Sequence, residues 1–161
     1  MDALYAPWRH SYIPRDGAKK KECPFCAARE THNDEESFVL QRTEHSIIML
    51  NKYPYNGGHI LIVPHQHVAA LDLLSPEVRS DLMEQVSRAA CIVTEVLHCN
   101  GINIGINIGD ACGGSIPEHI HIHVLPRWKG DTGFLPTLAH TKTISTNLRE
   151  EYELLLPHFS A

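Results

Sequence analysis

The feature that most constrains this chain is an alternation of histidine with isoleucine in the run His119-Ile120-His121-Ile122-His123. Successive side chains of a β-strand point to opposite faces, so the three imidazoles would share one face, about 7 Å apart along the strand. The isoleucines would then point into a core. Burying three imidazoles without partners is costly. The run therefore predicts a strand over residues 119–126 whose histidine face holds a polar ligand, either a nucleotide phosphate or a metal ion.

Length and charge set the broad class. The 161 residues suit one domain, which we divide into an N-terminal arm (1–22), a core (23–137) and a C-terminal tail helix (138–161). A net charge of −5 gives no reason to expect nucleic acid as a partner. No stretch is apolar enough to predict a membrane span, and five cysteines do not indicate a disulfide framework, so we expect a cytoplasmic protein.

The hydrophobic pattern predicts an α+β fold. Ser75 and Pro76 are typical of a helix start, apolar side chains recur at helical spacing up to residue 97, and Gly101 is expected to end the helix. A C-terminal helix is expected over residues 145–156. The expected strands are 38–41, 46–50, 59–63, 102–108 and 119–126. Short connections favour an antiparallel five-stranded sheet, with helix 76–97 on one face and the other face free for chemistry.

Two chemistries fit three imidazoles on one face. Two or three of them could chelate zinc. Alternatively, the central His121 could attack an electrophile while its neighbours orient it and bind the leaving charge. The residues of the run do not by themselves decide between these two interpretations.

A second motif, Cys23-Pro24-Phe25-Cys26, has the spacing of a zinc knuckle. Zinc needs two further ligands, and because the sequence has no second C-x-x-C, imidazoles must supply them. His67 and one histidine of the run are the best candidates. A redox pair or two unrelated thiols are the alternatives, although no βαβ pattern surrounds the motif.

A glycine-rich loop over residues 109–115 directly precedes the histidine run. Glycines such as Gly114 let backbone N–H groups approach a phosphate closely, and the Ser115 hydroxyl can add a donor. Arg127, after the run, is either a phosphate ligand or a surface residue. Three aromatic residues would either stack on a base or fill the core: Trp8, Tyr53 and Trp128.

Continued to Pro126 and Arg127, the run resembles the signature of the histidine triad (HIT) superfamily, in which three histidines alternate with apolar residues. Segments 4–13, 113–119 and 126–131 are similar to a bacterial branch related to diadenosine tetraphosphate hydrolases and phosphorylases. Segment 51–64 is similar to the nucleoside-side segment of the family. The resemblance implies a nucleotidyl hydrolase or transferase that cleaves dinucleoside polyphosphates or adenylylated compounds at the α-phosphorus.

The resemblance also implies roles for single residues. His121 corresponds to the nucleophile, which would form a nucleotidyl-histidine. The nucleotidyl group would later be transferred to water or inorganic phosphate. His123 corresponds to the phosphate-contacting partner and His59 to the residue that supports the triad. The positions matching the nucleotide contacts are Asn51 on the ribose side and Asn107 and Ser115 on the phosphate side.

In zinc-bearing members of the superfamily the ligands correspond to Cys23, Cys26, His67 and His119, which implies a structural zinc. Magnesium would arrive only with the nucleotide. Ser115, where many relatives carry Gln, resembles the phosphorylase-like branch, so the acceptor stays open. The resemblance implies a homodimer with a continuous ten-stranded sheet. Two alternatives are a zinc-dependent hydrolase that uses the triad as ligands and an adenine-nucleotide-binding protein without turnover.

Overall fold

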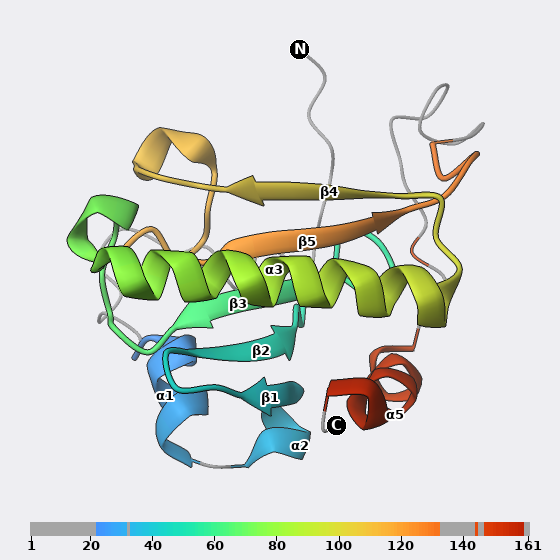
Figure 1. Ribbon diagram of the computed structural model, residues 1–161, viewed down its shortest axis with the longest axis horizontal. Coiled ribbons are helices and arrows are strands. Elements are labelled where there is room, and N and C mark those ends of the chain that lie inside the picture. Colours follow the sequence, from blue (N-terminus) through green and yellow to red (C-terminus); the bar gives the residue numbers. More distant parts are fainter. Residues whose placement is uncertain (1–21, 32, 133–143, 145–146, 160–161) are drawn as a thin grey trace.

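The computed structural model describes residues 22–31, 33–132, 144 and 147–159. They form one antiparallel sheet with helices against it (Figure 1). The strand order is β1-β2-β3-β5-β4. In chain order the elements are α1 (Pro24–Thr31), α2 (Asp34–Ser37), β1 (Val39–Arg42), β2 (Ser46–Leu50), β3 (Ile60–Pro64), η2 (Leu71–Leu73), α3 (Pro76–Leu97), β4 (Gly101–Ile106), η3 (Asp110–Cys112), β5 (Ile122–Arg127) and α5 (Leu148–Phe159). The predicted α+β fold with a five-stranded antiparallel sheet is confirmed.

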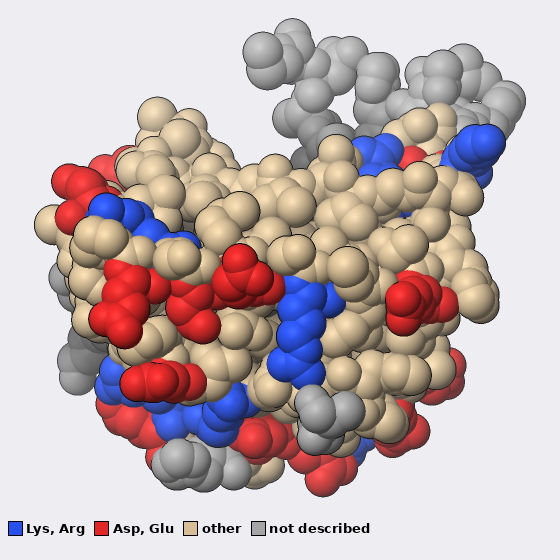
Figure 2. Space-filling view, in the orientation of Figure 1, with Lys and Arg blue, Asp and Glu red and all other residues tan. Residues whose placement is uncertain are grey.

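Helix α3 covers one face of the sheet, as the periodicity predicts (Figure 1). The Ser75 side chain caps the helix by accepting from the Val78 N–H. The buried stripe of the helix packs on alternate residues of the strands, and its members are Val78, Leu82, Val86, Ala89 and Val93. Acidic side chains gather over part of the outward side of this face (Figure 2). An apolar stripe with a polar outer surface is what one-sided packing requires.

The end of α3 differs from the expectation. His98, not Gly101, adopts the left-handed conformation that terminates the helix, with φ of 49°. Gly101 is already the first residue of β4. The chain therefore turns three residues earlier than the glycine suggested, and a non-glycine residue accepts the unfavourable conformation there.

The opposite face of the sheet carries a second apolar cluster, covered by α1. Phe25 and Ala28 of α1 pack on side chains of β1, β2 and β3. The strands thus alternate between two buried faces, and β2 and β3 are buried at every position. The histidine run lies on this second face, since His123 pairs with Leu61 in the ladder and Leu61 belongs to the α1-side cluster.

Strand β5 begins at Ile122 rather than at His119. His119 to His121 form a lead-in outside the ladder, where the Ile120 N–H donates to the Val68 carbonyl. The alternation holds nonetheless: Ile120 and Ile122 are 2 % exposed on the α3 side. The other strands lie within one or two residues of the predicted bounds, and short helix α2 was not predicted.

The C-terminal helix is an integral part of the core rather than a tail. Helix α5 runs to Phe159, three residues beyond the predicted end, with Pro157 in its last turn. It packs against α3 and β1, and its buried side chains are Tyr152, Leu155 and Phe159. The rest of the predicted tail and the N-terminal arm up to residue 21 lie outside the described residues. None of the helices in the described part combines the length and apolar character that crossing a membrane requires.

Candidate functional site

The three histidines of the run lie at the α1-side face with different exposures. His119 is 1 % exposed and His121 is 8 % exposed, while His123 is half-buried. The ring centroids of His121 and His123 are 4.8 Å apart. The central ring is therefore close to its neighbour, nearly enclosed, and still in contact with solvent.

The main chain orients the His121 ring. Its Nδ1 lies 2.9 Å from the carbonyl oxygen of His119. Because a carbonyl only accepts, Nδ1 must carry the proton, and in the neutral ring Nε2 then keeps a free lone pair. The geometry presents a nucleophilic nitrogen that needs no separate base to deprotonate it.

A chain of hydrogen bonds defines the neighbouring tautomers. The Tyr55 N–H donates to Nδ1 of His59 at 3.2 Å, and the Asn51 amide lies 3.3 Å from the same atom. Neutral His59 must therefore carry its proton on Nε2, which donates to Nδ1 of His123 at 2.9 Å. Neutral His123 then carries its proton on Nε2. Two adjacent rings thus offer a free lone pair, on His121, and an N–H donor, on His123.

Burial keeps these imidazoles neutral. Desolvation, followed by the neighbouring His123 and His121, lowers the pKa of His59 to about 3. Desolvation and the nearby His121 lower the pKa of His123 to about 4. Desolvation also lowers the pKa of His121, although the hydrogen bond to the His119 carbonyl opposes this. A nucleophilic imidazole must be unprotonated, so these shifts favour the reactive form over a wide pH range.

The glycine loop borders this pair of rings. The Asn107 amide nitrogen lies 3.3 Å from Nε2 of His123. Because that Nε2 carries the proton, the hydrogen bond between them requires the amide turned so that its oxygen accepts. A side chain at Gly114 would lie 3.4 Å from the Cβ of Asn107, so the loop backbone passes close to that residue. Ser115 follows on the exposed surface. Of the predicted nucleotide contacts, Asn51, Asn107 and His123 therefore belong to one hydrogen-bonded set with His59, and Gly114 and Ser115 lie on the adjoining loop.

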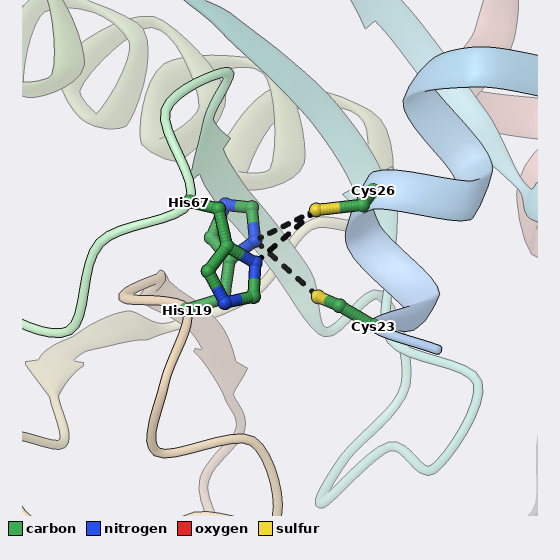
Figure 3. Close-up of side chains that lie close together, drawn as sticks. All are labelled: Cys23, Cys26, His67 and His119. Carbon is green, nitrogen blue, oxygen red and sulfur yellow. Dashed lines mark hydrogen bonds between the residues drawn. The ribbon is translucent and has the colours of Figure 1, made fainter. Parts of the chain in front are cut away.

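A separate cluster contains Cys23, Cys26, His67 and His119 (Figure 3). All four potential ligand atoms lie within 4.8 Å of one another. Nδ1 of His119 is 3.4 Å from Sγ of Cys23, and Nδ1 of His67 is 3.2 Å from Sγ of Cys26. Tetrahedral zinc with ordinary Zn–S and Zn–N bonds would require S···N separations of about 3.6 Å. The arrangement fits zinc.

The surroundings of the cluster also suit a cation. Burial and the neighbouring Cys23 raise the pKa of Cys26, so a positive ion is needed to favour the thiolate. Nε2 of His119 donates to the Pro64 carbonyl at 2.9 Å, which leaves Nδ1 facing the sulfurs. Within the described part of the chain this is the sole group of three or more potential metal ligands. Of the three histidines in the run, only His119 belongs to it.

Arg127 is engaged elsewhere. Its guanidinium makes two bonds to the Asp131 carboxylate, at 2.6 and 2.8 Å, and a third to Oδ1 of Asn103. Asp131 also accepts from the buried Asn56 amide. This network ties the chain after β5 to the loop before His59, so the contacts of Arg127 among the described residues are structural. Tyr53 is 39 % exposed and Trp128 is half-buried, so neither is core, and Trp8 lies outside the described residues.

Two aromatic residues of the site were not singled out from the sequence. Phe25, between the two cysteines, contacts the rings of both His119 and His121. The Tyr55 ring stacks on His123 with centroids 5.9 Å apart. Both occur inside motifs that the sequence does reveal, but an apolar or aromatic residue within a short motif carries no chemical signal of its own.

The fold and site define a class of α+β domain in which paired imidazoles on one sheet face adjoin a glycine loop and a Cys/His cluster. The HIT domain family matches residues 32–130, more than half of the chain. A Mycobacterium tuberculosis protein named AP-4-A phosphorylase is 34% identical, and the alignment covers 96% of this chain and 83% of that protein. This chain belongs to the HIT family.

Two further comparisons refine this assignment. The Schizosaccharomyces pombe bis(5'-nucleosyl)-tetraphosphatase (asymmetrical) is 35% identical over 59% of this chain and 52% of that protein. A crystal structure of a Zn-bound histidine triad family protein from Mycobacterium smegmatis superposes with a TM-score of 0.71. It is 28% identical, over 86% of this chain and 94% of that one. The resemblance stated from the sequence is confirmed by these matches.

Proposed function

We propose that this protein cleaves dinucleoside polyphosphates, or related adenylylated compounds, at the α-phosphorus through a nucleotidyl-histidine on His121. The observation that carries the proposal is the 2.9 Å hydrogen bond from Nδ1 of His121 to the His119 carbonyl, which leaves Nε2 free to attack. The names of the Mycobacterium tuberculosis and Schizosaccharomyces pombe relatives support the substrate class.

In the first step Nε2 of His121 attacks the α-phosphorus and a P–N bond forms. The P–O bond to the bridging oxygen breaks, and its electron pair leaves with the remaining polyphosphate. Charge grows on the phosphoryl oxygens during this step, and donors already in place stabilise it. We assign this role to the Nε2–H of His123, to Asn107, and to the loop at Gly114 and Ser115. His59 supports His123, and Asn51 contacts the ribose.

In the second step the acceptor oxygen attacks phosphorus and the P–N bond breaks, which returns the electron pair to Nε2. Water would give a nucleoside monophosphate, and inorganic phosphate would give a nucleoside diphosphate. Imidazole suits both steps because it is a good nucleophile and, on phosphorus, a good leaving group. Magnesium would enter only with the nucleotide phosphates.

We also propose that the Cys/His cluster holds a structural zinc through Cys23, Cys26, His67 and His119. When bound, such an ion cross-links α1 to the lead-in of β5 and to the loop after β3. The cluster takes only His119 from the triad, which argues against a zinc hydrolase that uses all three histidines as ligands. The Mycobacterium smegmatis neighbour is itself Zn-bound, which supports this choice of metal.

Two further proposals concern assembly and location. Strand β4 forms one edge of the sheet, and Ile104 within it is 52 % exposed. An edge strand with an exposed apolar residue favours pairing with another strand, so we propose a homodimer in which two β4 strands join the sheets. The cysteines of the described residues are free, which supports the cytoplasm as the location.

The test is to trap the intermediate. The wild-type protein, incubated with diadenosine tetraphosphate and quenched rapidly, should carry an adenylyl group on His121 that peptide mass spectrometry detects. His121→Ala should abolish both this group and turnover while zinc stays near one per chain. Loss of zinc in that variant would instead favour His121 as a ligand. Nucleotide binding with no labelled histidine would favour a binding protein without turnover.

Product analysis identifies the acceptor. AMP and ATP formed from diadenosine tetraphosphate without added phosphate would indicate hydrolysis. ADP whose formation depends on added inorganic phosphate would indicate phosphorolysis. Ser115→Gln, which introduces the residue that the resemblance associates with many relatives, should shift the balance between these products if Ser115 helps to select the acceptor.

A further inference from the structure

The ring of Phe25 lies where the Cys/His cluster meets the proposed nucleophile. Phe25 is the third residue of the Cys23–Cys26 motif and is 5 % exposed. Its ring centroid is 5.4 Å from that of His119, at 82°, and 4.9 Å from that of His121, at 57°. One apolar ring therefore contacts both a residue of the cluster and the ring that would attack phosphorus.

The Cys23–Cys26 segment at the start of α1 contacts His119 and His121 in different ways. The thiols of Cys23 and Cys26 approach Nδ1 of His119, at 3.4 and 3.7 Å. The ring of Phe25, between them in sequence, packs on His121 instead. The His119 carbonyl in turn accepts from Nδ1 of His121. The nucleophile is thus held at one ring nitrogen by the backbone of a cluster residue and on its ring by the side chain between the cysteines.

Each of these two contacts restrains a different motion of the His121 ring. A single hydrogen bond at Nδ1 fixes the distance of that atom but lets the ring rock about the bond. An aromatic ring packed against the imidazole opposes that motion, because rocking would lose dispersion contacts or cause overlap. The direction of the Nε2 lone pair depends on this second restraint, and attack on phosphorus requires an aligned lone pair.

We propose that Phe25 is a positioning residue that couples the order of the Cys/His cluster to the orientation of the His121 nucleophile. The expected effect on the rate of adenylyl-histidine formation rests on the proposed function. According to this proposal, the C-x-x-C segment affects that rate as well as the stability of the fold. Phe25 itself touches no reacting atom and acts through His121.

The experiment compares variants of the zinc-loaded full chain. Phe25→Leu removes the ring, and Phe25→Tyr keeps it. Val39→Ala is the matched control, since Val39 is 1 % exposed in the same apolar cluster. It lies on β1, three strand positions from β5 and hence about 14 Å away. Phe25→Met, which keeps the volume without the ring, replaces Phe25→Leu if that variant does not fold.

The readouts are zinc per chain, affinity for diadenosine tetraphosphate, the single-turnover rate of adenylyl-histidine formation, and the ¹⁵N NMR signals of His121. Phe25→Leu should keep zinc and bind substrate within about twofold of wild type, while the single-turnover rate falls about 10- to 100-fold. The His121 signals should keep the Nδ1–H tautomer, because the His119 carbonyl still accepts, but should broaden as the ring rocks. Phe25→Tyr should restore both the rate and the sharp signals, and Val39→Ala should change neither.

Two results would overturn the proposal. One is a rate in Phe25→Leu that falls no more than in Val39→Ala. The other is loss of zinc together with the rate, which would assign Phe25 to the metal cluster alone. If the wild-type protein formed no adenylyl-histidine, the proposed function would fail instead, and the NMR signals of His121 would still decide whether Phe25 orients that ring.

Discussion

At the scale of single residues, the site depends on a buried, uncharged histidine. His59 is 1 % exposed, and both of its ring nitrogens have partners. The backbone N–H of Tyr55 can only donate, so the proton of His59 is directed towards His123. In a protonated His59, Nδ1 would also carry a proton. It could then no longer accept from the Tyr55 N–H, and two donors would face each other. The arrangement is therefore compatible with the neutral ring only.

His59 makes stability depend on pH. Its pKa falls from 6.5 to about 3 on folding, so between these values the unfolded chain binds a proton that the folded chain does not. Its contribution to stability is present above pH 6.5 and is lost as the pH falls towards 3. The slope contributed by one such group approaches about 1.4 kcal/mol per pH unit.

The variant His59→Gln should flatten this dependence by about that amount, because an amide does not titrate in this range. Urea unfolding at pH 4.5 and pH 7.5, with the same zinc content in both proteins, measures the change. His158→Gln, at an exposed position of α5, is the control. An unaltered slope in His59→Gln would mean that His59 is protonated in the folded protein.

At the scale of secondary-structure elements, α5 shows how a segment outside the matched family region completes the core. The family match ends at residue 130, and α5 spans Leu148–Phe159. Leu155 and Phe159 are fully buried against the α3-side cluster. Arg88 of α3 donates to the Phe159 carbonyl, which satisfies a group at the end of the helix. We infer that the domain needs α5 for stability.

Two adjacent leucines of α5 test this inference. Leu155 is 0 % exposed and Leu154 is 50 % exposed. Leu155→Ala should lower the free energy of unfolding by about 2–5 kcal/mol, because it leaves a cavity in the core. Leu154→Ala should change it by no more than about 0.5 kcal/mol. Chemical denaturation measures both, and equal effects of the two substitutions would show that α5 does not pack as described.

At the scale of the whole molecule, the two edges of the sheet differ. β1 is flanked by α2 and α5, whereas β4 has an exposed pattern along most of its length. Ile104 and Ile108 near this edge are 52 % and 45 % exposed. Unpaired strand edges with exposed apolar side chains tend to associate. The asymmetry supports β4 as the edge used in the proposed homodimer.

Ile104→Lys should convert the proposed dimer to a monomer, since a charge buried between two paired strands is costly. Light scattering after size-exclusion chromatography measures the mass in solution. The matched control is Leu154→Lys, on α5, which contacts the opposite edge strand β1. A wild-type monomer, or a dimer in both variants, would contradict the proposed interface.

Much of the fold could be predicted from local patterns. The periodicity of α3 and the Ser75 cap place its helix at residues 76–97, as observed. The bounds of β2 were also correct. Two helix ends differed from the expectation. His98, three residues before Gly101, ends α3, and α5, which packs on β1 and α3, continues through Pro157. Strand β5 begins at Ile122 because its pairing with β3 and β4 begins at that residue.

The residue types of the site were predictable, but their connections were not. Alternation of histidine with isoleucine is a local steric property of an extended chain, so the sequence by itself determined that His119, His121 and His123 share a face. The family resemblance already implied the four residues of the Cys/His cluster, but the tautomers and the contacts among its atoms required the tertiary structure. Cys23 is 96 positions from His119, and His59 is 64 from His123. Only the tertiary structure brings such distant atoms within hydrogen-bonding range, because their separation depends on the packing of the whole sheet and not on the conformation of any one segment.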